Sequence, residues 1–169
     1  KISGSVNVHG SKNATLPIIV SSLLSEKTLK LSNVPNVVDV LNLIKLLKNY
    51  GVKIEHKKNK LKINPSKIKN LSADYDVVRK MRASILILGP LLSRFGEARI
   101  SLPGGCAIGT RPIDIHLAGL SKLGANFEIQ NGFVVGSVKS QLIGNKIKLP
   151  FPSVGATENI LMASVLAKG

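Results

Sequence analysis

The sequence is short of several residue types, and each shortage excludes a class of protein. Its 169 residues include one cysteine, no tryptophan, four phenylalanines and two tyrosines. A single cysteine cannot form an internal disulfide, which favours a reducing, cytoplasmic compartment. The most apolar early run, Leu16 to Leu24, is about nine residues long and contains Pro17, so it is too short to span a bilayer. We expect no membrane partner and no secretion signal.

Acidic residues are also scarce. Nine Asp and Glu against 24 Lys and Arg give a formal net charge of +15, which admits nucleic acid, acidic membranes or small anions as partners. Many lysines lie in 53–69, where Lys alternates with Leu and Ile as in a strand with one solvated face. Aromatic residues, on which single-stranded bases would stack, make up 4% of the chain. We therefore expect a solvated lysine face and no nucleic-acid partner, with a basic RNA-binding module as the alternative.

The chain carries a loose internal repeat of about 70 residues. Apolar helices are predicted to begin at Asn13-Ala14-Thr15, at Arg82-Ala83-Ser84 and at Gly155-Ala156-Thr157. In the first two copies a short strand, a proline loop, a second helix closed by a glycine and a hairpin follow, the second hairpin turning at 131–132. The predicted helices are 13–24, 38–50, 82–92, 113–123 and 155–166, and the predicted strands are 28–31, 52–56, 60–63, 97–100, 126–130, 133–138 and 146–149.

These elements indicate a mixed α/β fold, in which residues 1–169 form one incomplete domain. Its units are about 1–72, 73–143 and 144–169, and the third stops at Lys168-Gly169 where the other two continue. Because repeated units that cannot bury their own apolar face stack on neighbours, we expect the chain to be a piece of a longer protein.

The three equivalent helix starts are candidate anion sites, because free backbone N–H groups and the helix dipole attract negative charge there. Ordinary capping by Ser11, Ser84 or Ser153 is the alternative for each helix. Two cations, Lys12 and Arg82, at equivalent starts favour a phosphate or carboxylate pocket. Asp114, at the start of a second helix, suits the dipole and could equally accept hydrogen bonds from a sugar or base.

Cys106 lies in the loop 101–112, after two glycines and five residues before Arg111. A nearby guanidinium lowers the pKa of a thiol and can pair with an anionic substrate. This setting suits a reactive cysteine and an ordinary loop thiol equally.

Neither a metal nor a nucleotide cofactor is indicated. His9, His56 and His116 show no metal-ligand spacing, and we interpret all three as surface or loop residues. No glycine-rich phosphate loop follows a strand.

Four blocks of sequence carry a family resemblance that covers the whole chain in order. They resemble the enolpyruvyl transferase family, in the branch that acts on UDP-N-acetylglucosamine. The resemblance implies an inside-out α/β prism with three strand and helix units per domain, two such domains closing on the substrates. The blocks are Ser11 to Thr15, Met81 to Ser84 with Leu88 to Pro90, Leu102 to Cys106 with Gly109 to Pro112, and Ser153 to Thr157.

The resemblance also implies a reaction. The enolpyruvyl group of phosphoenolpyruvate passes to the 3-hydroxyl of UDP-N-acetylglucosamine, phosphate leaves, and peptidoglycan synthesis, on which cell shape and division depend, begins. Cys106 would be the proton donor, would form an adduct with phosphoenolpyruvate and would be the residue that fosfomycin alkylates. Lys12 and Arg111 would hold the phosphate and carboxylate of phosphoenolpyruvate, with Asn13 beside them. The UDP-sugar site would be lined by Arg82, Pro112, Ile113, Asp114, Ile115, Phe151, Pro152, Ser153 and Val154.

The chain departs from the family pattern in two ways. Some members carry a lysine where this chain has Phe151, so one charged contact to the nucleotide is lost or supplied otherwise. Family chains are over twice as long, and their general-base aspartate and further arginines lie in the part absent here. We therefore expect negligible turnover by this chain alone. The sister reaction, with shikimate 3-phosphate as acceptor, is the enzymatic alternative.

Overall fold

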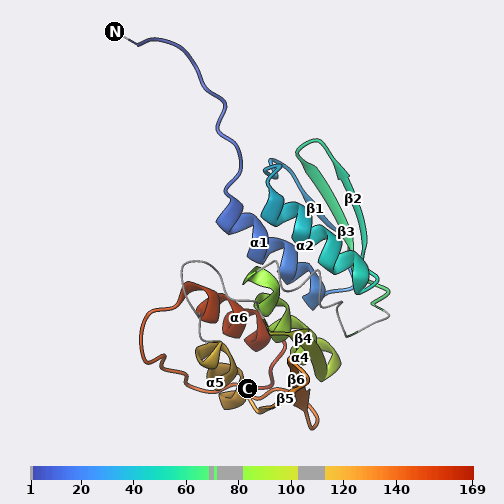
Figure 1. Cartoon of the computed structure of the whole chain (residues 1–169), viewed down its shortest axis with the longest axis vertical. Coiled ribbons are helices and arrows are strands. Elements are labelled where there is room, and N and C mark those ends of the chain that lie inside the picture. The colour runs from blue at the N-terminus through green and yellow to red at the C-terminus, as the bar shows by residue number, and fades with distance from the viewer. Residues whose placement is uncertain (1, 69–70, 72–81, 103–112) are drawn as a thin grey trace.

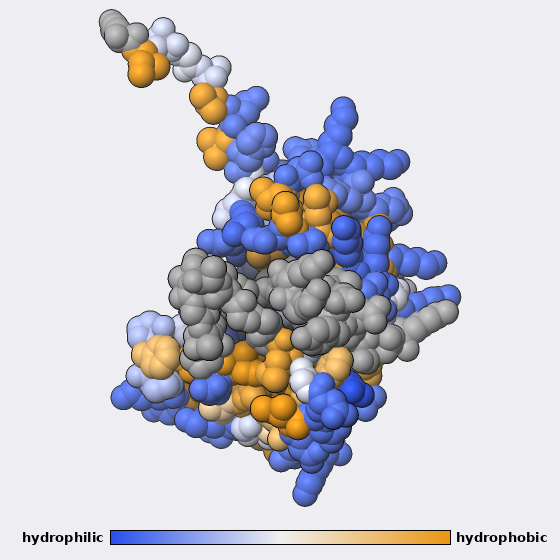
Figure 2. All heavy atoms as spheres, viewed as in Figure 1, coloured by the Kyte–Doolittle hydropathy of each residue, from blue (hydrophilic) through white to orange (hydrophobic). Residues whose placement is uncertain are grey.

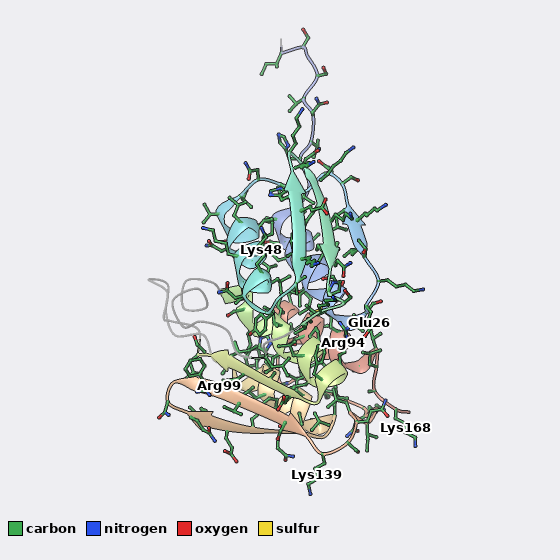
Figure 3. The ribbon with its side chains drawn as sticks, turned by 90° about the vertical axis from the view of Figure 1, so that its right-hand side faces the viewer. Glu26, Lys48, Arg94, Arg99, Lys139 and Lys168 are labelled. Atoms are coloured by element: carbon green, nitrogen blue, oxygen red, sulfur yellow. The ribbon has the colours of Figure 1, made fainter. Side chains whose placement is uncertain are left out.

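The computed structural model describes residues 2–68, 71, 82–102 and 113–169. Two small sheets lie on one side of the molecule and the helices pack behind them, as Figure 1 and the rotated view of Figure 3 agree. Residues before α1 extend away from the body. The arrangement follows from the sequence pattern, because strands such as β3 (Lys60–Asn64) and β4 (Glu97–Ser101) alternate in polarity and each sheet therefore has one apolar face to cover.

The first sheet and its helices form the upper half of the molecule in Figure 1. The three strands are antiparallel in the order β1-β3-β2. In β3, Leu61 and Ile63 are buried while Lys60 and Lys62 are exposed, which confirms the predicted lysine face. The elements are α1 (Lys12–Ser21), the 3-10 helix η1 (Ser22–Leu24), β1 (Leu29–Leu31), α2 (Val38–Asn49), β2 (Lys53–Lys57) and β3 (Lys60–Asn64).

The second sheet repeats this order as β4-β6-β5, again antiparallel. Asn131 and Gly132 both have positive φ, 50° and 79°, as the predicted type I′ turn requires. The unit boundaries themselves stay a prediction. The elements are the 3-10 helix η2 (Arg82–Ile87), α4 (Leu88–Phe95), β4 (Glu97–Ser101), α5 (Asp114–Lys122), β5 (Ala125–Gln130), β6 (Phe133–Val138) and α6 (Val154–Ser164).

The predicted strand 146–149 is wrong. Its alternation is real, since Ile147 and Leu149 are half-buried against the core while Lys146 and Lys148 are exposed. A strand also needs a neighbour to complete its hydrogen-bond ladder, and no described residue pairs with this segment. Among the described residues, the β-bridge closest in sequence to this segment is the isolated one between Ile143 and Lys168.

The helical segment predicted to begin at Arg82 is helical but not a single α-helix. It starts as η2 and becomes α4 at Leu88. The described helices include none with the length and apolar character needed to cross a bilayer.

Candidate functional site

Two helices begin with the same local structure. At α1 the Ser11 hydroxyl accepts a hydrogen bond from the Ala14 N–H at 3.3 Å, and the Thr15 hydroxyl donates to the Ser11 carbonyl at 2.7 Å. The start of α6 repeats these bonds with Ser153 as cap, at 3.3 Å from Ala156 and 2.8 Å to Thr157. Serine capping is therefore confirmed at both starts.

Capping at these starts is compatible with anion binding. Each serine side chain satisfies one of the several N–H groups that a helix start leaves free.

Lys12 forms an ion pair with Asp39, in the first turn of α2. Its Nζ lies 2.9 Å from Asp39 Oδ2, and both side chains are about half exposed, at 47% and 46%. Exposed pairs of this kind contribute about 0–1 kcal/mol, so Lys12 can leave Asp39 for an anionic ligand at small cost. Sequence reasoning did not select Asp39, although its position in a first turn, where carboxylates are favoured, is the signal that could have found it. Asn13, beside Lys12, is exposed.

The first turns of α5 and α6 lie together. Asp114 is the first residue of α5 and is exposed, as predicted. Two residues on, His116 lies against Gly155, whose Cβ, if it had one, would be 3.4 Å from Cε1 of the histidine ring. The structure thus brings the predicted residues at the start of α5 beside those at the start of α6.

The predicted residues of these two starts differ in what they offer a ligand. Phe151 and Val154 are 54% and 76% exposed, and Pro152 is also exposed, so their side chains are open to contact. Ile115 is buried in the core, so any contact of this residue with a ligand would come from its backbone.

Asn159, a buried residue of α6, holds the break between η2 and α4. In a continuous α-helix the Gly89 N–H would donate to the Ile85 carbonyl four residues earlier. Here the Gly89 N–H donates to Asn159 Oδ1 at 2.8 Å, and Asn159 Nδ2 donates to the Ile85 carbonyl at 2.9 Å. The side-chain amide is inserted into the helical ladder, which explains why the segment changes from 3-10 to α geometry there.

Gly89 makes this insertion possible. A Cβ on Gly89 would lie 2.5 Å from both the carbonyl oxygen and Oδ1 of Asn159. The two helices can approach this closely because position 89 has no side chain. Asn159 also contacts His116, with 3.1 Å between Nδ2 and Nδ1. One amide therefore connects η2, α5 and α6, at whose starts the predicted nucleotide residues of the described part lie.

His116 and His56 correct the view that all three histidines are surface or loop residues. His116 lies in α5, is half-buried, and burial lowers its pKa from the ordinary value of 6.5. His56 lies in β2, and its Nε2 is buried without a hydrogen-bond partner among the described residues. The burial of His56 results from the alternation of β2, and the burial of His116 results from the packing of α5. A search for metal-ligand spacing detects neither. His9 is exposed, as predicted.

A family model described as EPSP synthase (3-phosphoshikimate 1-carboxyvinyltransferase) matches residues 1–169. The chain belongs to this enolpyruvyl transferase family. It is 53% identical over 168 residues to the UDP-N-acetylglucosamine 1-carboxyvinyltransferase of Campylobacter jejuni strain 81-176, and 52% identical over 169 residues to that of Pelagibacter ubique. These alignments cover 99% and 100% of the chain. The chain spans 40% of the length of these curated relatives.

Solved enolpyruvyl transferases share the fold. NikO from Streptomyces tendae, an enolpyruvyl transferase, superposes with a TM-score of 0.82 at 19% identity, over 99% of this chain and 39% of its own. EPSP synthase from Acinetobacter baumannii gives 0.76 at 21% identity, over 98% and 39%. The predicted enolpyruvyl transferase fold is confirmed.

Several residues that the enolpyruvyl transferase resemblance selects lie outside the described part. These are Cys106, Arg111 and Pro112. Arg82 is described through its backbone, at the first position of η2. Ile113 immediately precedes α5 and is half-buried.

The outer face of the first sheet carries a hollow of about 470 Å³ whose lining includes none of the predicted site residues. Lys30, Lys57, Lys60 and Lys62 line it together with Glu55. Figure 2 shows hydrophilic side chains projecting from this half of the molecule. Because the elements of this face carry none of the predicted site residues, we interpret the hollow as part of the solvated lysine face. The described residues contain no group of histidine, cysteine and acidic side chains that could hold a metal ion.

Proposed function

We propose that the protein to which this chain belongs transfers the enolpyruvyl group of phosphoenolpyruvate to the 3-hydroxyl of UDP-N-acetylglucosamine and releases phosphate. The observation that carries the proposal is the 53% identity, over 168 residues, to relatives that bear the name of this activity. Because the chain spans 40% of their length, the activity belongs to the longer protein. We expect the longer protein to act in the cytoplasm. Its reaction would be the start of peptidoglycan synthesis.

The chemistry requires what the proposed site contains. The hydroxyl oxygen adds to C2 of phosphoenolpyruvate and gives its proton to a general base, while C3 gains a proton from an acid, which gives a tetrahedral intermediate. Loss of a proton from C3 and of phosphate from C2 then yields the enolpyruvyl ether. Two anionic substrates must first be brought together, which needs cations, and a carbon must be protonated, which needs a positioned acid.

We assign the residues to these tasks as the resemblance implies. Lys12 and Arg111 neutralise phosphoenolpyruvate, with Asn13 beside them, and Cys106 is the acid. Lys12 suits this role because its pair with Asp39 is exposed and easily exchanged. The sugar nucleotide takes the starts of η2, α5 and α6, through Arg82, Pro112, Ile113, Asp114, Ile115, Phe151, Pro152, Ser153 and Val154.

The rest of the longer protein is the second partner that we propose. Leu161 of α6 and Val165, which immediately follows this helix, are 65% and 64% exposed, whereas Ala156, Ile160 and Ala163 of the same helix are buried in the core. A further element of the longer protein would bury this apolar side, as α2 packs against α1. We therefore expect the 169-residue chain to release no measurable phosphate from the two substrates. Release at a rate above the buffer control would contradict this.

The test of the activity is labelling of Cys106. The longer protein to which this chain belongs is incubated with fosfomycin, with and without UDP-N-acetylglucosamine, and its intact mass is measured. We expect one adduct, formed faster with the sugar nucleotide and absent from Cys106→Ser. A general thiol reagent in a parallel incubation shows that the thiol is accessible. An accessible thiol that fosfomycin does not modify under either condition would refute the proposal.

The same assay separates the alternatives. Shikimate 3-phosphate as acceptor is less well supported, because the relatives matched at about 52% identity carry the UDP-N-acetylglucosamine name. If that acceptor were correct, shikimate 3-phosphate and not the sugar nucleotide would change the labelling rate. An RNA-binding module would instead shift labelled RNA in a salt-dependent way, without competition from UDP-N-acetylglucosamine.

A further inference from the structure

The amide of Asn159 has a defined orientation. Its Oδ1 faces the Gly89 N–H, which can donate but not accept, and its Nδ2 faces the Ile85 carbonyl, which can accept but not donate. Exchanging the amide oxygen and nitrogen would place like groups against each other at both contacts. Two backbone groups on another helix therefore decide which end of this side chain is the donor.

This orientation determines the protonation of His116. The second N–H of Asn159 Nδ2 points to His116 Nδ1, 3.1 Å away. An amide nitrogen does not accept hydrogen bonds, so Nδ1 must be the acceptor and carry no proton. The neutral ring then has its proton on Nε2.

The protonated nitrogen faces the start of α6. A Cβ at Gly155 would lie 3.4 Å from Cε1 and 3.6 Å from Nε2 of His116. Gly155 lies one helical turn before Asn159, so the ring edge from Nδ1 through Cε1 to Nε2 runs along α6 toward its first turn. That first turn follows Ser153 and holds the exposed Val154.

We propose that Asn159 is a positioning residue that locks His116 as the Nε2–H tautomer, and that His116 presents this N–H as a fixed donor to an oxygen of the sugar nucleotide. The second half of this inference rests on the proposed function. The ligand atom is a hydrogen-bond acceptor, a carbonyl or phosphate oxygen, because a donor cannot bind an N–H. Burial of the ring supports the neutral form, since it lowers the pKa of His116.

The first test measures the tautomer without a ligand. Long-range ¹H–¹⁵N correlation spectra of the ¹⁵N-histidine-labelled chain at about pH 8, where a histidine with a lowered pKa is neutral, distinguish a protonated from an unprotonated ring nitrogen. The signal that disappears in His116→Asn belongs to His116. We expect protonated Nε2 and unprotonated Nδ1. In Asn159→Asp, which offers oxygens alone, Nδ1 should gain a proton. A protonated Nδ1 in the wild-type chain would overturn the inference, even if the variant does not fold.

The second test separates the two ring nitrogens by substitution. The side chain of Asn reaches the position of Nδ1, so His116→Asn keeps an acceptor for Asn159 and loses the outward donor. The longer Gln reaches the position of Nε2, so His116→Gln keeps the outward donor. Titration calorimetry of the longer protein with UDP-N-acetylglucosamine should show about tenfold weaker binding for His116→Asn and less than about threefold weaker binding for His116→Gln.

The two tests fail in different ways. Equal binding by wild type and both variants, or weaker binding by His116→Gln than by His116→Asn, overturns the donor role. If the longer protein binds no sugar nucleotide, its proposed function and the donor role both fail, while the spectrum still decides the tautomer. If His116 had only a structural role, both variants would change in stability. His116→Gln would then not bind the sugar nucleotide more tightly than His116→Asn.

Discussion

Arg94 connects the two halves of the molecule, and its replacement offers the sharpest test of the fold. It lies in the last turn of α4, with 12% of its side chain exposed. Its Nη1 donates to three carbonyl oxygens of the first half, those of Leu23 at 2.9 Å, Ser25 at 3.2 Å and Pro65 at 3.3 Å. Figure 3 shows Arg94 beside Glu26, whose Oε1 lies 3.3 Å from Nη2.

The expected loss of stability follows from these contacts. Nη1 carries two protons, so the three carbonyls share at most two full hydrogen bonds. Each bond from a charged donor contributes at least about 1.5 kcal/mol, so Arg94→Met should lower the free energy of unfolding by about 3 kcal/mol. Methionine keeps an apolar stem, which limits the cavity. Glu26 is 79% exposed, so Glu26→Gln should cost under about 0.5 kcal/mol.

Urea denaturation followed by far-ultraviolet circular dichroism measures both variants. Arg94→Lys is the matched control for charge, since lysine keeps the charge but not the planar fork, and it should fall between wild type and Arg94→Met. The reasoning is refuted if Arg94→Met costs less than about 1 kcal/mol at an unchanged denaturant slope. It is also refuted if Glu26→Gln costs as much as Arg94→Met, because the ion pair would then outweigh the carbonyl bonds.

Three further predictions concern single side chains. Tyr50→Phe should raise the free energy of unfolding by about 1 kcal/mol, because the buried Tyr50 hydroxyl has no partner among the described residues. Lys60→Glu should stabilise the first hairpin by about 0.5 kcal/mol in low salt, because Lys60 lies directly across from Lys57. Stability should fall as pH drops below about 6.5, since the pKa of His116 is lowered in the folded state and the unfolded chain binds that proton first.

Each of these has a measurement that contradicts it. Urea midpoints compare Tyr50→Phe with wild type, and a lower midpoint would mean that the hydroxyl makes a stabilising bond. The gain from Lys60→Glu should shrink in high salt, so an equal gain at both salt concentrations would exclude a charge effect. The acid loss should be smaller in His116→Asn, and an identical pH profile would assign it to other groups.

Local order in this protein was readable from the sequence. The lysine alternation of β3, the Asn131-Gly132 turn and the serines that begin α1 and α6 each depend on residues one to four positions apart. Such patterns act before any distant contact forms, so the sequence determined most helices, strands and hairpins. It also indicated Lys12 and Ser153 as residues at helix starts.

What the tertiary structure decided depends on residues far apart in the chain. Asn159 inserts between groups 70 and 74 residues away, and Arg94 reaches carbonyls as far as 71 residues away. No local pattern distinguishes a buried bridging amide from an ordinary helical asparagine. The segment 146–149 shows the reverse, since it has a strand's alternation without a neighbour in the described residues. Periodicity determines which side of a segment is apolar, whereas hydrogen-bond partners, and with them the helix break and the histidine tautomer, exist only once distant elements meet.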